Sequence, residues 1–314
     1  MAIQLLGFPT TLGLPHKYHE YGPDALRRAG LVPMLEALGE TVEDLGDLPL
    51  EPGTNAVPVI TRVQKVVDAA RRQAEYWQKV LRPGNLMMTL GGDHSTSLGT
   101  IWALSAMGRT FDVVWIDAHG DYNVLETSPS GNVHGMVLSL AVGLMPLFLH
   151  QLVGTECLHF WGIRSVDPGE QVLLERSHAT LADPDQVRRR KDALIDRLKP
   201  DVFLSFDIDS VDPSEAPGTR TPVPGGFTRA EALDLVDRLS RRRNLVALDI
   251  VEFHPDRDQN ALTLNLALAV ARTAIANQLA RRTEGETTNE DLRCRPAPGA
   301  DPGSLSHDVW GGRS

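Results

Sequence analysis

Apolar and polar residues alternate along this chain in blocks that predict short buried strands separated by amphipathic helices. Residues 59–80 carry apolar side chains every three or four positions, which is the period of a helix with one buried face. Continuous apolar runs such as FDVVWI and DVFLSF instead predict strands that are covered on both faces. The alternation therefore predicts an α/β fold, with a mostly parallel central sheet and helices on both of its faces.

The predicted elements follow one another from near the N-terminus to residue 282. The predicted strands cover residues 3–7, 85–90, 111–117, 157–163, 201–207 and 244–251. The predicted helices cover residues 23–39, 59–80, 95–107, 133–143, 167–177, 184–198, 228–241 and 260–282. Beyond them the sequence is polar and rich in Pro and Gly, which predicts a mobile tail over residues 283–314. We expect a single domain over residues 1–282, because candidate site residues occur from position 94 to position 252.

Composition and charge exclude several classes of protein. With 314 residues, of which 42% are hydrophobic, the chain can bury a large core. The net charge of −10 argues against a nucleic-acid binder and suits a small cationic substrate. No apolar stretch approaches the roughly 20 residues that a membrane span needs. The two cysteines, Cys157 and Cys294, form no disulfide framework, so we expect a soluble protein of the cytoplasm.

Six side chains of the kinds that bind metal ions occur in three segments, each directly after an apolar run. Open α/β sheets place their sites at the carboxyl ends of strands, and residues two apart on a strand point the same way. Carboxylates with a minority of imidazoles favour Mn²⁺-like ions over zinc, and Ni²⁺ and Co²⁺ fit the same ligands. Two such ions about 3.5–4 Å apart can activate water for hydrolysis. The six are His94 in GGDHS, Asp117, His119 and Asp121 in DAHGD, and Asp207 and Asp209 in SFDIDSVDP.

Each segment also has a plainer interpretation when it is taken alone. GGDH fits a tight turn, and a DxD pair often caps a helix. His134 in SGNVHG could be a cap or a packed residue, although its nearness in sequence to the second metal segment favours catalysis. Glu252 ends the run LVALDIVEF and could be solvated or salt-bridged. At the same sheet edge as the metal segments, it could instead face a cationic substrate.

The three metal segments, in this order and spacing, resemble those of the ureohydrolase family, which includes arginase, agmatinase and formiminoglutamase. The resemblance extends over about residues 3–282 and implies an arginase-like α/β/α fold with two Mn²⁺ ions per subunit. It also implies a homo-trimer or homo-hexamer. By this resemblance Asp117 and Asp207 would bridge the ions, His94 and Asp121 would complete one site, and His119 and Asp209 the other.

Within the family, the stretch DAHGDYNVLETSPSGNVHG is most similar to arginase, and GIRSVDPGE resembles the arginase element RDVDPGE. These matches imply a site for an α-amino acid head group beside the metal ions. They assign the substrate carboxylate to Asn123, Ser128 and Ser130, the α-amino group to Asn132, Asp167 and Glu170, proton transfer to His134, and part of the guanidinium-binding region to Thr221.

The resemblance implies hydrolysis of L-arginine to L-ornithine and urea by a hydroxide that bridges the metal ions. Glu252 would hold the guanidinium, and Asp209 would hydrogen-bond the nucleophile. Two alternatives within the family are an agmatinase and a guanidino-acid hydrolase. A metal-binding homologue without turnover is a further alternative, which the complete set of site residues disfavours. Deacetylase-type hydrolases are disfavoured because they use a single zinc ion.

Several positions depart from the arginase pattern in the loops where this family sets its substrate choice. Arg220 matters most, since an inward guanidinium could pair with a substrate carboxylate and favour a guanidino acid of another length. An outward Arg220 would instead act at a subunit contact. The other departures are Gly120, Ser165, His254 and the Lys17, Tyr18, His19 loop.

Overall fold

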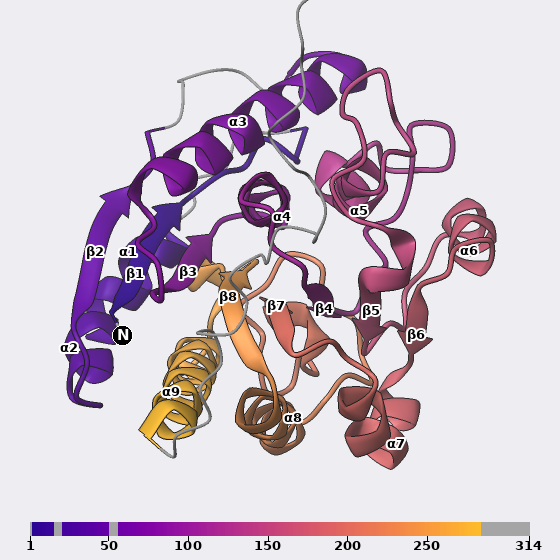
Figure 1. The fold of residues 1–314 in the computed structure, drawn as a ribbon. Helices are drawn as coiled ribbons and strands as arrows, with labels where there is room; N and C mark the ends of the chain where they lie inside the picture. The colour runs from indigo at the N-terminus through magenta and orange to yellow at the C-terminus, as the bar shows by residue number, and fades with distance from the viewer. Residues whose placement is uncertain (1, 16–20, 50–55, 284–314) are drawn as a thin grey trace, which may run out of the picture.

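Eight parallel strands form the central sheet of the computed structural model, which describes residues 2–15, 21–49 and 56–283 (Figure 1). The strand order across the sheet is β2-β1-β3-β8-β7-β4-β5-β6. The predicted α/β class is confirmed, and every strand pair is parallel. The strands are β1 (Ile3–Phe8), β2 (Val42–Asp47), β3 (Leu86–Gly91), β4 (Asp112–Ile116), β5 (Leu158–Trp161), β6 (Thr180–Ala182), β7 (Asp201–Asp207) and β8 (Asn244–Val251).

Helices cover both faces of this sheet, as the apolar strand runs predict (Figure 1). On one face lie α3 (Val59–Val80), α4 (Thr96–Ala106) and α5 (Val137–Ala141), which share one buried apolar cluster with the strands. On the other face lie α1 (Gly22–Arg28), α2 (Leu31–Glu36), α7 (Pro184–Asp196), α8 (Arg229–Arg242) and α9 (Leu262–Thr283), around a second cluster. Helix α6 (Pro168–Glu175) connects β5 to β6.

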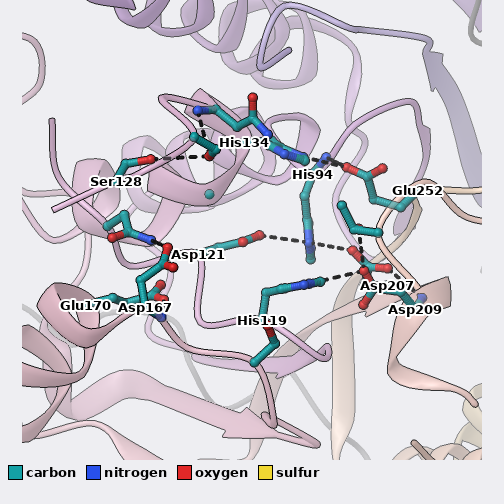
Figure 2. Close-up of a pocket in the computed structure, with 16 residues that line it drawn as sticks. His94, His119, Asp121, Ser128, His134, Asp167, Glu170, Asp207, Asp209 and Glu252 are labelled. Atoms are coloured by element: carbon teal, nitrogen blue, oxygen red, sulfur yellow. Dashed lines mark hydrogen bonds and ion pairs between the residues drawn. The ribbon is translucent and has the colours of Figure 1, made fainter. Parts of the chain in front are cut away.

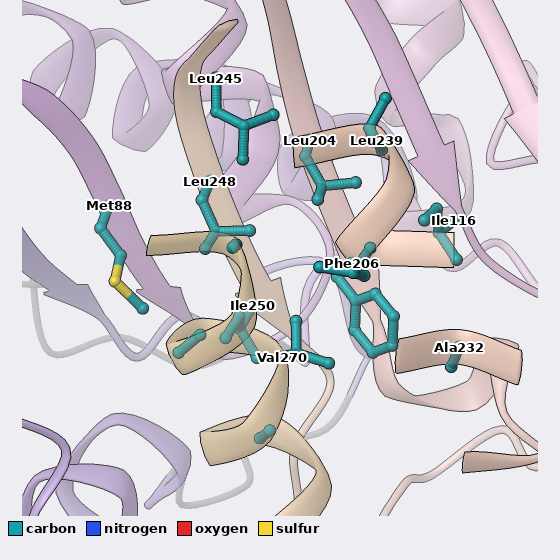
Figure 3. Packing of buried hydrophobic residues seen from close by; sticks show 14 of the residues in the cluster. Met88, Ile116, Leu204, Phe206, Ala232, Leu239, Leu245, Leu248, Ile250 and Val270 are labelled. Carbon is teal, nitrogen blue, oxygen red and sulfur yellow. The ribbon is translucent and has the colours of Figure 1, made fainter. Parts of the chain in front are cut away.

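Large apolar side chains fill the layer between the central strands and helices α8 and α9 (Figure 3). Leu204 of β7 and Leu248 of β8 are fully buried there, together with Leu239 of α8 and Val270 of α9. Each such side chain contributes roughly 1.5–3 kcal/mol of hydrophobic free energy when it is buried. The strands that end at the candidate site are therefore held by packing on both faces.

The structure corrects the predicted boundaries in three places. The predicted helix 23–39 is two helices, because Gly30 lies between them with a left-handed φ of 88°. The edge strands β2 and β6 were not predicted: β2 is largely polar and partly exposed, and β6 has only three residues. The predicted helix 133–143 begins as a 3₁₀ turn, η1 (Val133–Met136), before the short α5.

The sheet order brings the carboxyl ends of four strands together, because β3, β8, β7 and β4 are neighbours. These strands lead into the three predicted metal segments and into Glu252. Three predictions fall outside the described residues: the loop of Lys17, Tyr18 and His19, the thiol at Cys294, and the tail from residue 284 onward. Among the described helices, none is both long and apolar enough to cross a membrane.

Candidate active site and metal centre

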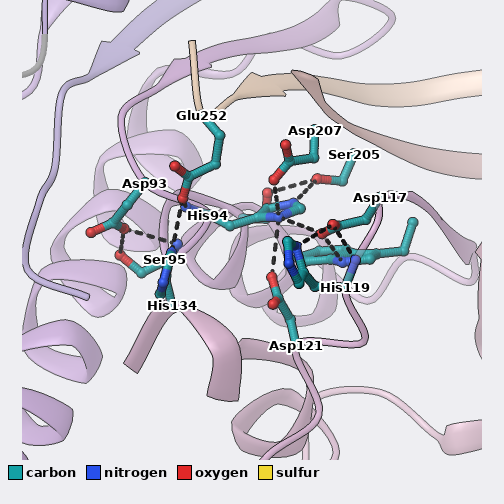
Figure 4. A network of polar contacts seen from close by, with 12 residues as sticks. Asp93, His94, Ser95, Asp117, His119, Asp121, His134, Ser205, Asp207 and Glu252 are labelled. Carbon is teal, nitrogen blue, oxygen red and sulfur yellow. Dashed lines mark hydrogen bonds and ion pairs between the residues drawn. The ribbon is translucent and has the colours of Figure 1, made fainter. Parts of the chain in front are cut away.

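Four of the predicted metal ligands converge on one point at the carboxyl edge of the sheet (Figure 4). The Nδ1 atom of His94 lies 2.9 Å from Asp117 Oδ2, 3.1 Å from Asp121 Oδ2 and 3.0 Å from Asp207 Oδ2. The four side chains come from the ends of β3, β4 and β7, and all four residues are buried. One imidazole nitrogen therefore faces three carboxylate oxygens.

A second group of ligand-type atoms lies beside the first and shares Asp117 with it. His119 Nδ1 lies 3.4 Å from Asp117 Oδ1 and 3.2 Å from Asp209 Oδ2. The two sets, His94 with Asp117 and Asp121, and His119 with Asp117 and Asp209, each bring their ligand atoms within 4.8 Å of one another. This arrangement fits two neighbouring cations with one carboxylate between them.

The surroundings of His94 aim its Nδ1 at the carboxylates. Its Nε2 lies 2.8 Å from Ser205 Oγ, and its ring stacks on Trp115 with centroids 3.8 Å apart. Trp115 also donates from Nε1 to Asp117 Oδ2 at 2.9 Å. Within the described part of the chain, the buried Nδ1 has no hydrogen-bond partner of ordinary geometry. The contacts with Ser205 and Trp115 fix the His94 ring, and its Nδ1 then faces three carboxylate oxygens. One imidazole nitrogen with several carboxylate oxygens is a donor set that suits a divalent cation, so these residues fit the metal ions that the family resemblance implies.

The negative charges in this cluster also favour the binding of cations. Burial raises the pKa of Asp207 well above its ordinary value, and the nearby carboxylates of Asp209 and Asp117 raise it further. Burial alone would lower the pKa of His119, but the charges of Asp209 and Asp117 outweigh it and raise that pKa to about 12. Four carboxylates share a buried space with two imidazoles, so bound cations would relieve a strong repulsion.

Glu252 forms a second buried polar centre next to the metal cluster. Its Oε1 accepts from the backbone N–H of His94 at 2.9 Å and lies 2.9 Å from His134 Nδ1. Its Oε2 lies 3.4 Å from His254 Nε2. Burial alone would raise the pKa of Glu252, but the two imidazoles outweigh it and hold that pKa well below its usual range. Burial alone would lower the pKa of His134, but the Glu252 carboxylate outweighs burial and raises that pKa to about 9.

Glu252 and Asp121 have φ values of 59° and 47°, in the left-handed region that residues other than glycine seldom adopt. Such backbone strain persists only where the surrounding structure imposes it, and it concentrates at functional sites. Both side chains are thereby turned toward the shared cavity.

A cavity of about 260 Å³ opens over both centres (Figure 2). All the predicted site residues except Asp117 line it, including His134, Thr221 and Glu252. The loop after β4 contributes Asn123, Ser128, Ser130 and Asn132, and the segment leading into α6 contributes Asp167 and Glu170.

The wall opposite Glu252 is held by a hydrogen-bonded network. Asn123 Nδ2 donates to Asp167 Oδ2 at 3.0 Å, and Asn123 Oδ1 accepts from Thr127 Oγ1 at 2.9 Å. Asp167 and Glu170 form the capping box at the start of α6. Glu170 also accepts from the backbone N–H of Tyr122 at 2.7 Å, while burial raises the pKa of its carboxyl to about 7.

The departures from the arginase pattern fall at different distances from this cavity. Ser165 lines it, and a Cβ on Gly120 would lie 2.7 Å from Glu170 Oε1, so the glycine leaves room for that carboxyl. Among the described lining residues Thr221 is present and Arg220 is not. Thr221 Oγ1 donates to Asp209 Oδ2 at 2.8 Å, which orients that predicted ligand.

The structure adds site residues that sequence reasoning missed. Ser205 and Trp115 contact the predicted ligands, and Asp249 lies behind them, accepting from Ser97 Oγ at 2.9 Å. Asp93 accepts from the backbone N–H of Gly13 at 2.8 Å. The sequence signals for these residues were a polar side chain inside an apolar strand run, at Ser205 and Asp249, and the single acidic residue of GGDHS, Asp93.

Comparison with known proteins agrees with this geometry. The sequence profile of the arginase family matches residues 1–276. An arginase of Bacillus caldovelox is 32% identical over 298 residues, which covers 88% of this chain and 99% of that relative. The native structure of Bacillus caldovelox arginase at pH 5.6 superposes with a TM-score of 0.78 at 30% identity, covering 87% of this chain and 98% of that one. A structure described as a hypothetical agmatinase from Burkholderia thailandensis gives 0.69 at 26% identity, covering 90% and 87%. This chain belongs to the arginase family.

Proposed function

We propose that this protein hydrolyses L-arginine to L-ornithine and urea. Members of its family act on guanidino and amidino groups, and the finer assignment depends on the shape of the cavity. One observation supports it most: a single cavity carries Glu252 and the metal-type cluster on one side and the Asn123, Ser128 and Asp167 wall on the other. Such a cavity has partners for both ends of an amino acid that carries a guanidinium.

The cluster residues are the ones that would hold two divalent cations. One set is His94, Asp117 and Asp121, and the other is His119, Asp117 and Asp209, with Asp207 beside the first. When bound, such a pair of ions lowers the pKa of water and so supplies a nucleophile at neutral pH. Thr221 donates a hydrogen bond to Asp209, which orients the Asp209 carboxylate, and this carboxylate would hydrogen-bond the nucleophile.

Glu252 and His134 would act on the guanidinium and the leaving amine. Glu252 is buried and its pKa is low, so it is an anion at neutral pH, matched to the planar donors of a guanidinium. The raised pKa of His134, about 9, keeps its imidazole protonated at pH 7. A protonated imidazole in contact with Glu252 can deliver a proton to the departing amine.

The opposite wall would hold the α-amino acid head group. Hydroxyl and amide donors of Asn123, Ser128 and Ser130 are suited to a carboxylate. The carboxyl groups of Asp167 and Glu170, with the amide of Asn132, are suited to an α-ammonium group. Agmatine has no carboxylate and would leave the first set of donors without a ligand.

We further propose that the ions are two Mn²⁺ per subunit, with Ni²⁺ and Co²⁺ as substitutes, since oxygen donors outnumber nitrogen donors in both sets. The family resemblance supports a homo-trimer or homo-hexamer, a catalytic domain over residues 1–282, and a tail without a catalytic role. The scarcity of cysteine supports a cytoplasmic location. Metal analysis of the purified protein and light scattering test the ion content and the assembly.

A competition experiment tests the proposed substrate. Purified protein loaded with Mn²⁺ is given an equimolar mixture of L-arginine, agmatine, 4-guanidinobutyrate and 3-guanidinopropionate, and the amine products are separated by chromatography. L-Ornithine should appear first and dominate. Early dominance of putrescine would instead identify an agmatinase, the name given to one structural relative, and dominance of an amino acid without an α-amino group would identify a guanidino-acid hydrolase. No product from any of the four would favour a homologue without turnover.

A further inference from the structure

Arg62, in the first turn of α3, is a buried residue whose guanidinium has no counter-ion among the residues that the structure describes. The residue is 5% exposed, and its Nε and Nη1 atoms have no hydrogen-bond partner within the described residues. Burial lowers its pKa, and no carboxylate in residues 2–15, 21–49 or 56–283 offsets that shift. An unpaired cation removed from water destabilises the folded protein, so such a residue is expected to have a partner that binds from outside.

The guanidinium lies directly behind the loop that forms one wall of the cavity. A Cβ built on Gly131 would lie 3.6 Å from Arg62 Nη2, and Gly131 itself has a left-handed φ of 62°. On either side of this glycine, Ser128, Ser130 and Asn132 line the cavity. The hydroxyls of the two serines accept from the backbone N–H groups of Gly131 and Asn132. Arg62 Nη2 therefore lies next to the turn at Gly131, whose neighbours Ser130 and Asn132 line the cavity.

The charge of the cavity makes such a cation important. Its lining residues include six with carboxyl groups and neither a lysine nor an arginine among the described residues. The bound metal ions would offset the carboxylates at one end of the cavity only. A substrate carboxylate at the other end would lie near Asp167 and Glu170 and would be repelled unless positive charge lay close by.

We propose that Arg62 is a specificity-determining positioning residue that favours guanidino substrates bearing a carboxylate. The loop donors contact the carboxylate, and Arg62 supplies the positive potential behind them. The substrate carboxylate then lies in this positive potential, at a distance of about 10 Å and without direct contact with the guanidinium. This inference rests on the proposed hydrolysis of an α-amino acid, and it deepens that proposal by naming the source of the charge.

The test compares Arg62→Met, which removes the charge, with Arg62→Lys, which keeps it. Arg71→Met is the matched control, because Arg71 lies on the same helix, is exposed and pairs with Asp68. Arg62→Met should raise KM for L-arginine about tenfold, the size expected for opposite charges about 10 Å apart at an effective dielectric constant of about 20. Its kcat, and the KM for agmatine, should stay near the wild-type values. Arg62→Lys should restore most of the affinity for L-arginine.

Stability and product binding give readouts that do not depend on turnover. Loss of an unpaired buried charge should leave the Tm of the Arg62→Met protein unchanged or raise it. If Arg62 instead only stabilised the loop, its replacement would lower the Tm. Calorimetry should show L-ornithine binding weakened about tenfold by Arg62→Met, while putrescine binding is unchanged. Equal weakening of both ligands, or unchanged L-ornithine binding, overturns the role of Arg62.

These readouts separate the two proposals. Wild-type protein that binds L-ornithine but releases no urea from L-arginine would refute the proposed function and leave the Arg62 comparison intact. Wild-type turnover of L-arginine with an unaltered KM in Arg62→Met would refute only the role of Arg62.

Discussion

Asn123→Ala is the substitution that tests the head-group wall most sharply. The Asn123 side chain is buried and joins two parts of that wall, donating to Asp167 Oδ2 at 3.0 Å and accepting from Thr127 Oγ1 at 2.9 Å. Alanine removes both contacts together with the amide N–H that remains for a substrate carboxylate. The change leaves the metal cluster and Glu252 in place, so chemistry at the guanidinium should continue.

The expected loss follows from the kind of hydrogen bond that disappears. A hydrogen bond to a charged group is worth about 1.5–3 kcal/mol. Each 1.4 kcal/mol corresponds to about a factor of ten, so kcat/KM for L-arginine should fall roughly 10- to 100-fold. Most of this loss should appear in KM. Agmatine keeps an amine but has no carboxylate, so its kcat/KM should fall by no more than about threefold.

Steady-state urea release from both substrates measures the effect. Asn277→Ala is the matched control, because Asn277 is also a buried amide, bonded to Asp237 and Ser240 between α8 and α9. The control should lower the free energy of unfolding without altering either KM. If Asn123→Ala reduces kcat/KM equally for the two substrates, the assignment of this wall to a carboxylate is refuted.

Three further substitutions probe other parts of the structure. His119→Ala should remove one of the two metal ions, counted by elemental analysis, and abolish urea release; full retained activity would contradict the ligand assignment. Thr221→Val removes the hydrogen bond to Asp209 and should lower metal affinity about 10- to 100-fold, measured by competition with a chelator. The third substitution, Asp112→Asn, changes a residue that does not line the cavity. Burial alone would raise the pKa of Asp112, but the hydrogen bonds that its carboxylate accepts outweigh burial and lower that pKa. A depressed carboxyl pKa stabilises the fold above about pH 4 and loses its effect as pH falls through the folded value. Urea titrations should therefore show Asp112→Asn destabilised at pH 7, and its difference from the wild-type protein should shrink as the pH falls below about 4.

The metal-type residues could be predicted because their geometry is local. Asp117, His119 and Asp121 follow a buried strand, and a period of two places them on one side of the chain. The general rule for parallel sheets then brings strand ends together at one edge. The sheet order that makes β3, β8, β7 and β4 neighbours depends on long-range pairing, which no short segment encodes.

The residues that orient the metal-type side chains could not be predicted, because their positions also depend on long-range strand pairing. Ser205 and Trp115 orient His94 across strand boundaries, so their role appears only when β3, β4 and β7 are side by side. The burial of Arg62, whose Nε and Nη1 have no hydrogen-bond partner among the described residues, could likewise not be predicted from a helical pattern, where an arginine is normally assigned to the solvated face. The edge strands β2 and β6 were missed because partly exposed or very short segments carry a weak apolar signal.

The cavity of this arginase-family protein should bind an α-amino acid with a guanidinium at its far end. The most direct test is kcat/KM for L-arginine and for agmatine, measured separately on protein with a known Mn²⁺ content. A site that hydrogen-bonds the substrate carboxylate predicts at least about a hundredfold preference for L-arginine. Equal values, or a preference for agmatine, would contradict the account.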